Sequence, residues 1–120
     1  LFVVSHELRP DSAGNGQWRG GLGAVCEIIY DGKSKGTMNT AGDGMIVPPF
    51  GLFGGSEGLP HRYSIVSNGT ERVLKSKETE VTLLPGDRII ALASGGGGYG
   101  DPKKRDKNSL EWDKKNGYLS

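Results

Sequence analysis

The feature that most constrains the fold is a run of four consecutive glycines, Gly95–Gly98. An apolar stretch, 89–93, leads directly into this run, and Tyr99, Gly100, Asp101 and Pro102 end it. Glycine loses more conformational freedom on folding than any other residue, so an ordered run needs close neighbours that compensate. The run is also too short and too specific in its ending to be a flexible linker. We therefore expect Gly95–Gly98 to be ordered and packed against backbone, either elsewhere in the chain or in a neighbouring subunit.

Two other stretches mix glycine with aromatic residues and are the expected neighbours of this run. One spans 14–23, and the other spans 40–60, where prolines exclude both a helix and a regular central strand. For the second stretch we expect extended, polyproline-like backbone packed by Phe50, Leu52 and Phe53. The residues expected to have structural or interface roles come from all three stretches: Trp18, Arg19, Gly20, Gly21, Phe50, Phe53, Gly95, Gly96, Gly97, Gly98, Tyr99 and Asp101.

The remainder of the chain has the pattern of short strands separated by turns. A strand is expected over 2–8, and turn residues between apolar runs predict antiparallel hairpins over 24–39, 62–75 and 78–93. The sequence indicates one helix, over 109–115, with Asp106 or Asn108 as its N-cap. We predict one mainly β domain over 1–120. Its antiparallel hairpins form a barrel-like or sandwich arrangement with glycine-rich polyproline-like segments and one short C-terminal helix.

Composition excludes several classes of function. The net charge of the chain is only +1, which gives no indication of a nucleic-acid partner. Glycine is unusually frequent, since it makes up 21 of 120 residues where an ordinary share would be about 7%. A single cysteine, Cys26, rules out an internal disulfide and a zinc site built from cysteines. No stretch has the length of a membrane span, and no secretory signal is visible. A cytoplasmic location is expected, with no nucleic-acid or membrane partner.

No motif for catalysis, cofactor binding or metal binding is found. A phosphate loop would need a lysine after its last glycine, whereas Asp101 and Pro102 follow Gly100 here. Two histidines, His6 and His61, are too few for a metal site. We therefore expect no catalytic, cofactor-binding or metal-ligating residue in this chain.

The isolated arginines and acidic residues have more than one interpretation. Arg19 and Arg62 could bind carboxylates or phosphates, but structural ion pairs are favoured for both. Asp101 and the other turn aspartates are expected to cap turns through their side chains. A small hydrolase built on Asp11, His61 and Arg62 is the least favoured possibility.

Three stretches together resemble one family. They read Glu-Leu-Arg-Pro-Asp-Ser-Ala-Gly at 7–14 with Trp-Arg-Gly-Gly-Leu-Gly at 18–23, then Pro-Pro-Phe-Gly-Leu-Phe-Gly-Gly at 48–55, and finally Leu-Pro-Gly-Asp at 84–87 with the glycine run to Pro102. In this order and spacing they resemble the C-terminal part of the hydantoinase B/oxoprolinase family. The resemblance covers nearly the whole chain.

The resemblance implies a role inside a larger enzyme. The family includes B-type subunits of ATP-dependent N-methylhydantoinases, the second half of 5-oxoprolinases, and subunits of acetone and acetophenone carboxylases. ATP is bound by an A-type subunit, which phosphorylates the substrate, and the B-type subunit takes part in hydrolysis or carboxylation. By resemblance, the expected partners are the A-type subunit and the rest of a B-type subunit in a hetero-oligomer. ATP with magnesium would then belong to the partner subunits, where the resemblance also allows a divalent metal.

Two main functional hypotheses follow. The first is a structural or interface component of an ATP-dependent enzyme acting on cyclic amides or ketones, without catalysis alone. The second is a free-standing β-rich binding module that reuses the same scaffold. The sequence does not separate hydrolase from carboxylase, and the chains bound to this one would decide between the hypotheses.

Overall fold

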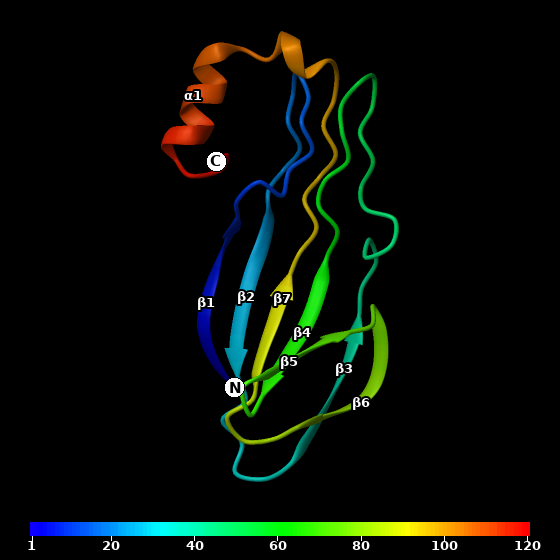
Figure 1. Cartoon of the computed structure of the whole chain (residues 1–120), viewed down its shortest axis with the longest axis vertical. Coiled ribbons are helices and arrows are strands. Elements are labelled where there is room, and N and C mark those ends of the chain that lie inside the picture. The colour runs from blue at the N-terminus through cyan, green and yellow to red at the C-terminus, as the bar shows by residue number, and fades with distance from the viewer.

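The computed structural model describes residues 1–120 as an elongated molecule with principal extents of 54 × 28 × 19 Å. One half contains the strands, and the other half contains extended glycine-rich segments and the only α-helix (Figure 1). The elements in chain order are β1 (Phe2–Arg9), β2 (Gly23–Ile29), β3 (Gly36–Ala41), β4 (Arg62–Ser67), β5 (Thr70–Leu74), β6 (Lys77–Leu83), β7 (Arg88–Leu92), the 3₁₀ helix η1 (Pro102–Lys104) and α1 (Lys107–Lys115). The mainly β prediction with one C-terminal helix is confirmed.

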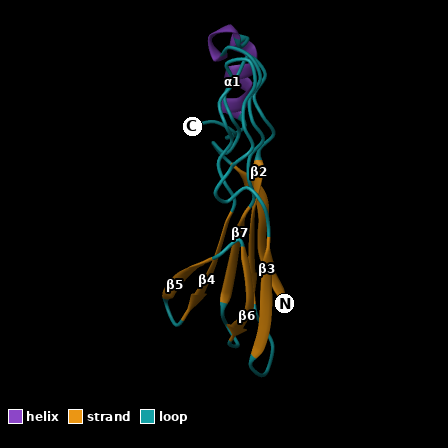
Figure 2. Cartoon of the chain, turned by 90° about the vertical axis from the view of Figure 1, so that its right-hand side faces the viewer, coloured by secondary structure: helices purple, strands orange, loops and turns teal.

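The strands form two separate antiparallel sheets. Five of them form a sheet in the order β1-β2-β7-β4-β5, and β3 pairs only with β6 (Figure 2). The five-stranded sheet has two free edges, at β1 and at β5. Neither sheet closes on itself, so of the two predicted arrangements, barrel-like or sandwich, the barrel-like one is wrong.

Of the three predicted hairpins, only the one over 62–75 is confirmed. β4 and β5 pair through the turn at Asn68 and Gly69, whose φ angles of 50° and 78° are both positive. Positive φ at both central residues is the requirement of a type I′ hairpin turn, which an Asn-Gly pair meets at little cost.

The hairpins predicted over 24–39 and 78–93 are wrong because the edges that they needed are already occupied. β2 pairs with β1 on one side and β7 on the other, so β3 cannot pair with it. In the same way, β7 lies between β2 and β4, which leaves no edge for β6. β3 and β6 therefore leave the large sheet and pair with each other.

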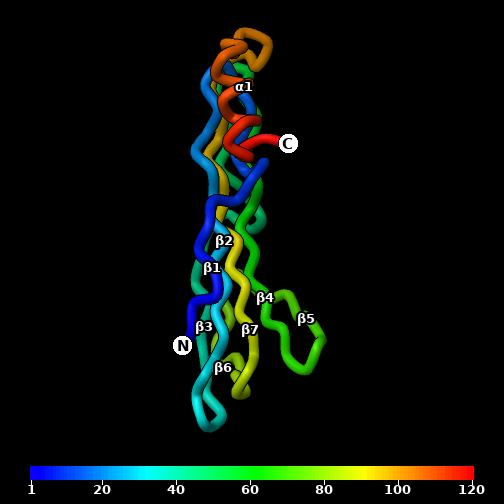
Figure 3. Tube along the Cα trace, turned by 90° about the vertical axis from the view of Figure 1, so that its left-hand side faces the viewer, coloured from blue at the N-terminus to red at the C-terminus, as the bar shows by residue number.

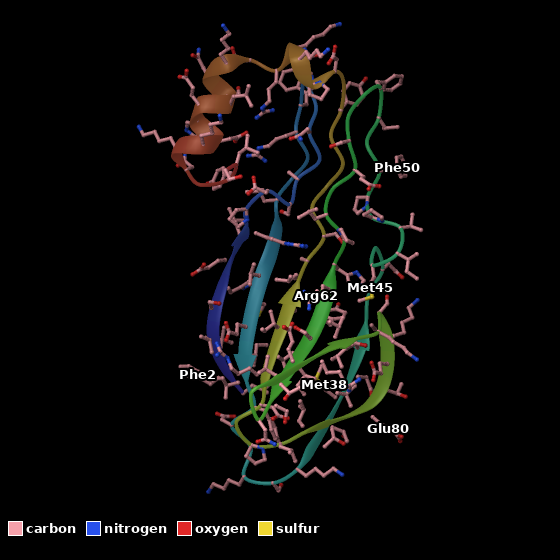
Figure 4. The ribbon with its side chains drawn as sticks, in the orientation of Figure 1. Phe2, Met38, Met45, Phe50, Arg62 and Glu80 are labelled. Carbon is pink, nitrogen blue, oxygen red and sulfur yellow. The ribbon has the colours of Figure 1, made fainter.

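The apolar core is small and lies between the two sheets. Its buried side chains are Ile65, Leu74, Val81 and Leu83, with Tyr30, Met38, Tyr63 and Ile89 packed against them. Apart from Tyr30, which directly follows β2, these residues come from strands of both sheets, and Figure 4 labels Met38 in this region. The core belongs to the strand half, so the glycine-rich half must be held together in another way.

α1 ends at Lys115, as its sequence predicts, and begins at Lys107, two residues before the predicted start. The Asp106 side chain accepts a hydrogen bond of 2.9 Å from the Ser109 N–H, which confirms Asp106 as the N-cap. Beyond the helix, Gly117 has a φ of 71°, a conformation that favours glycine. With nine residues, α1 is far too short to cross a membrane, and no other helix meets that requirement.

Candidate functional site

The glycine-rich half consists of three stretches of extended backbone that lie side by side. We call them the glycine-rich bundle, and it comprises residues 12–23, 48–60 and 94–101. The first two stretches each fold back on themselves, and the third runs between them (Figures 1 and 3). Apart from Gly23, the first residue of β2, the bundle contains no regular helix or sheet, only isolated backbone bridges.

Backbone hydrogen bonds along one side of the third stretch repeat every three residues. The N–H of Gly95 donates to the carbonyl of Leu59 at 3.1 Å, and the N–H of Gly98 donates to the carbonyl of Ser56 at 2.9 Å. Donors and acceptors are thus both spaced by three. Three residues per turn is the repeat of polyproline II backbone.

A second set of bonds with the same spacing points toward the first stretch. The N–H of Gly96 donates to the carbonyl of Gly21 at 2.9 Å, and the N–H of Tyr99 donates to the carbonyl of Trp18 at 2.8 Å. Consecutive residues of the third stretch therefore face different neighbours. With backbone on more than one side, this stretch has little room for side chains.

The glycine run is explained by how closely these neighbours approach. A Cβ atom built on the run would lie 1.8 Å from the Ser12 carbonyl oxygen at Gly95, 1.8 Å from that of Phe50 at Gly97, and 2.0 Å from that of Asn15 at Gly98. At Gly96 the nearest atom would be the Gly21 nitrogen at 3.1 Å, which is tight but less severe. The expected packing of Gly95–Gly98 against backbone of the other two stretches is confirmed.

Glycines in the neighbouring stretches meet the run in the same way. A Cβ on Gly20 would lie 1.9 Å from the Gly96 carbonyl oxygen, and one on Gly55 would lie 2.1 Å from that of Gly98. Gly21 differs, because a Cβ there would have no neighbour within 4 Å. Gly21 contributes its carbonyl oxygen to the bundle but has no steric need to be glycine.

The aromatic residues of the bundle contribute backbone contacts while their rings are exposed. Trp18 and Tyr99 form an antiparallel bridge, and the ring of Phe53 lies 5.2 Å from that of Tyr99 between centroids. The side chains of Trp18, Phe50 and Phe53 are 65%, 72% and 78% exposed, and Figure 4 shows Phe50 at the outside of the bundle. Of the three residues expected to pack this backbone, Phe50 is too exposed to do so, Leu52 is half exposed, and Phe53 contacts the Tyr99 ring. Close backbone contact takes over most of that role, and much of the surface of the Trp18, Phe50 and Phe53 side chains stays exposed.

A buried charged cluster connects α1 to the bundle. Asp113 on α1 is only 2% exposed, and it accepts bonds of 2.8 and 2.9 Å from the Nε and Nη2 atoms of Arg19. Arg105 donates a further bond of 2.6 Å to the same carboxylate. The predicted structural ion pair of Arg19 is confirmed.

The cluster shifts the pKa values of two of its members. Hydrogen bonding from Arg19 is the main cause that holds the pKa of Asp113 below its ordinary value, with Arg105 adding to the effect against the opposing effect of burial. The bond to Asp113 correspondingly raises the pKa of Arg19. Both charges therefore persist through the neutral range. Sequence reasoning missed Asp113, since nothing in its local sequence distinguishes it from an ordinary exposed helical aspartate.

Asp101, the last of the bundle residues predicted from the sequence, is the N-cap of η1. The Oδ1 atom of Asp101 accepts a bond of 3.0 Å from the Lys103 N–H and begins η1. This confirms the expected turn-capping role of Asp101.

The three residues of the hydrolase hypothesis have separate partners. Asp11 accepts a bond of 2.9 Å from the Ser120 N–H. The Nδ1 atom of His61 contacts the carbonyl of Asp43, and Arg62 forms an exposed ion pair with Glu71 at 3.0 Å. The structure shows no interaction that joins these residues into one site. It also contains no group of three or more His, Cys, Asp or Glu side chains arranged to hold a metal.

Comparison with protein families matches residues 1–102 to the model described as hydantoinase B/oxoprolinase. Among relatives, the chain is 30% identical to the B subunit of a putative D-/L-hydantoinase from a Pseudomonas species. It is 32% identical to the beta subunit of the Pseudomonas jessenii caprolactamase. Each match covers 100% of this chain but only 20% and 21% of the relative. The chain thus spans about a fifth of the length of these relatives.

Solved structures contain the same fold. An ATP-dependent caprolactamase from Pseudomonas jessenii matches with a TM-score of 0.78 and 27% identity, over 98% of this chain and 21% of that one. A nucleotide-free acetone carboxylase matches with a TM-score of 0.77 over 98% of this chain and 20% of that one, and at 21% identity it shows the likeness of fold. The family match over residues 1–102 includes the three glycine-rich stretches that build the bundle, and this chain belongs to the hydantoinase B/oxoprolinase family.

Proposed function

We propose that this chain is a structural and interface component of an ATP-dependent multisubunit enzyme that acts on cyclic amides or ketones, and that it does not catalyse the reaction alone. The observation that carries the proposal is the family match over residues 1–102 together with the backbone-packed bundle. Relatives that are hydantoinase and caprolactamase subunits support the same assignment.

The architecture supports a scaffolding role. Bonds between backbone groups hold the bundle together and leave the rings of Trp18, Phe50 and Phe53 on its surface. Aromatic residues are enriched in the contact surfaces of proteins. In this proposal the partners are an A-type ATP-binding subunit and the rest of a B-type subunit. They supply the ATP and magnesium site and any divalent metal.

The test is purification of the tagged chain from its native cells, with mass spectrometry of the bound chains and an assay of the complex. We expect a large ATP-binding chain to copurify. We also expect ATP-dependent turnover of at least one of hydantoin, 5-oxoproline, caprolactam or acetone. The isolated chain, assayed in parallel, should show no ATP hydrolysis. A chain that purifies without partners would favour a free-standing binding module instead.

A further inference from the structure

The two edges of the five-stranded sheet are not equivalent. β5 is the shorter edge strand, with five residues, and it pairs only with β4. It exposes charged side chains, since Glu71 forms an ion pair with Arg62 and Arg72 forms one with Glu78. Short length and exposed charge are the features by which natural sheets prevent further pairing at an edge.

β1 is less protected by length and charge, and a β-bulge between Val3 and Ser5 is the one irregularity in its pairing with β2. It is eight residues long, pairs only with β2, and exposes the apolar side chains of Phe2, Val3, Val4 and Leu8. β1 contains neither lysine nor proline, and its two charged residues, Glu7 and Arg9, lie at its C-terminal end, where Arg9 donates to the carbonyls of Pro60 and Ala93. A long apolar edge of this kind is a template for another strand.

The free side of β1 is also open in space. In Figures 1 and 3 no other segment of the chain covers β1 along the strand half, and α1 lies beyond its end over the bundle. Figure 4 shows Phe2 on this open side. An approaching strand would therefore meet no obstacle from residues 1–120.

The unpaired backbone groups and exposed apolar side chains of β1 determine what kind of segment can bind at this edge. Outward N–H and C=O groups alternate along an edge strand with a spacing that only another extended backbone matches. Exposed apolar side chains on β1 would be covered at the same time by apolar side chains of the added strand. The occupant is therefore an extended, weakly charged segment of polypeptide.

We propose that β1 is extended by a strand from the remainder of the same B-type polypeptide, outside residues 1–120. The relatives are about five times as long as this chain, so most of such a polypeptide lies outside these residues. The inference rests on the proposed function only in requiring that the chain is part of a B-type subunit. Strand addition at β1 would continue the antiparallel sheet beyond its present five strands.

Photo-crosslinking in the purified complex identifies the occupant directly. Phe2, which is 61% exposed, is replaced by a benzophenone analogue of phenylalanine, and cross-linked peptides are sequenced by mass spectrometry. We expect one dominant cross-link to a peptide of the same polypeptide outside 1–120. Cross-links to an A-type subunit, to a second copy of β1, or to no protein at all would overturn the proposal.

A matched pair of variants provides a second readout. Val4→Lys places a charge on the β1 edge, and Val73→Lys places the same charge on β5, where Val73 is similarly exposed at 52% against 43% for Val4. In hydrogen-exchange measurements on the complex, Val4→Lys should speed exchange in the β1 peptide at least about tenfold, whereas Val73→Lys should leave β1 unchanged. Equal exchange of β1 in the wild type and Val4→Lys would contradict strand addition. Both readouts are structural, so a complex that lacks ATP-dependent turnover would refute the proposed function without affecting this result.

Discussion

Arg19 and Asp113 are 94 positions apart in sequence and are joined by two hydrogen bonds, of 2.8 and 2.9 Å, in the folded chain. Arg19 lies in the first stretch of the bundle and Asp113 lies on α1. The pair is therefore the charged contact that fixes the helix against the glycine-rich half. Two parallel bonds between a guanidinium and a carboxylate hold orientation as well as distance.

Removing the carboxylate should destabilise the chain strongly. In Asp113→Ala, the guanidinium groups of Arg19 and Arg105 would lose their shared partner while remaining largely covered, and breaking a buried pair costs about 3 kcal/mol. Urea unfolding followed by circular dichroism measures the loss. Glu111→Ala, at an exposed position of the same helix, is the control and should change the free energy of unfolding by less than about 0.5 kcal/mol. Equal effects of the two substitutions would show that the cluster does not anchor α1.

The same carboxylate should make stability depend on pH in acid. The pKa of Asp113 is lowered in the folded chain, so the unfolded chain binds its proton more readily. The stabilisation is therefore fully present above the unfolded pKa of about 3.9 and is lost as pH falls through the lower folded value. Unfolding free energies measured between pH 6 and 2 should fall over this window in the wild type. The fall should be shallower in Asp113→Asn, and identical slopes would contradict the prediction.

Alanine at Gly97 should disrupt the bundle. The added Cβ would lie 1.8 Å from the Phe50 carbonyl oxygen, and backbone cannot move aside as a flexible side chain can. We expect a loss of at least about 3 kcal/mol, at the upper end for an overpacked site. Thermal unfolding compares this variant with Gly21→Ala, where the Cβ meets nothing within 4 Å and the melting temperature should hardly change. An unchanged melting temperature for Gly97→Ala would mean that the run is a loose loop.

Ser12 is the third position where a single change should matter. Its side chain is fully buried, donates a bond of 2.6 Å to the Arg9 carbonyl and accepts one of 2.8 Å from the Gly23 N–H. Ser12→Ala leaves both backbone groups without this partner, at a cost of about 2 kcal/mol. Chemical unfolding of this variant beside the exposed control Ser34→Ala checks the value, and equal stabilities would show that the bonds of Ser12 are dispensable.

The parts of the fold that depend on a few residues adjacent in the sequence could be predicted from the sequence. The Asn68-Gly69 turn, the Asp106 cap and the backbone packing of the glycine run each depend on the conformational limits of one or two residue types. These limits act over a few positions, so the sequence alone reveals them.

Strand pairings and side-chain contacts between segments far apart in the sequence could not be predicted from local sequence chemistry. The sequence predicts a hairpin over 24–39, yet β2 has β1 and β7 as its neighbours, and β3 pairs with β6. Strand pairing depends on which edges remain free once the whole sheet is assembled. Asp113 was missed for a related reason, because its partner Arg19 is close only after the bundle has formed.

Because the hydrogen bonds of the third stretch repeat every three residues, its number of residues can change without disrupting them only in steps of three. Deleting one glycine from 95–98 would rotate every later residue by about a third of a turn. The amide of Tyr99 would then point away from the Trp18 carbonyl that it now meets at 2.8 Å. Removing a whole triplet would restore the direction of each amide and shift only its partner along the neighbouring stretch. Length changes in this part of the family should therefore be tolerated in multiples of three before they are tolerated singly.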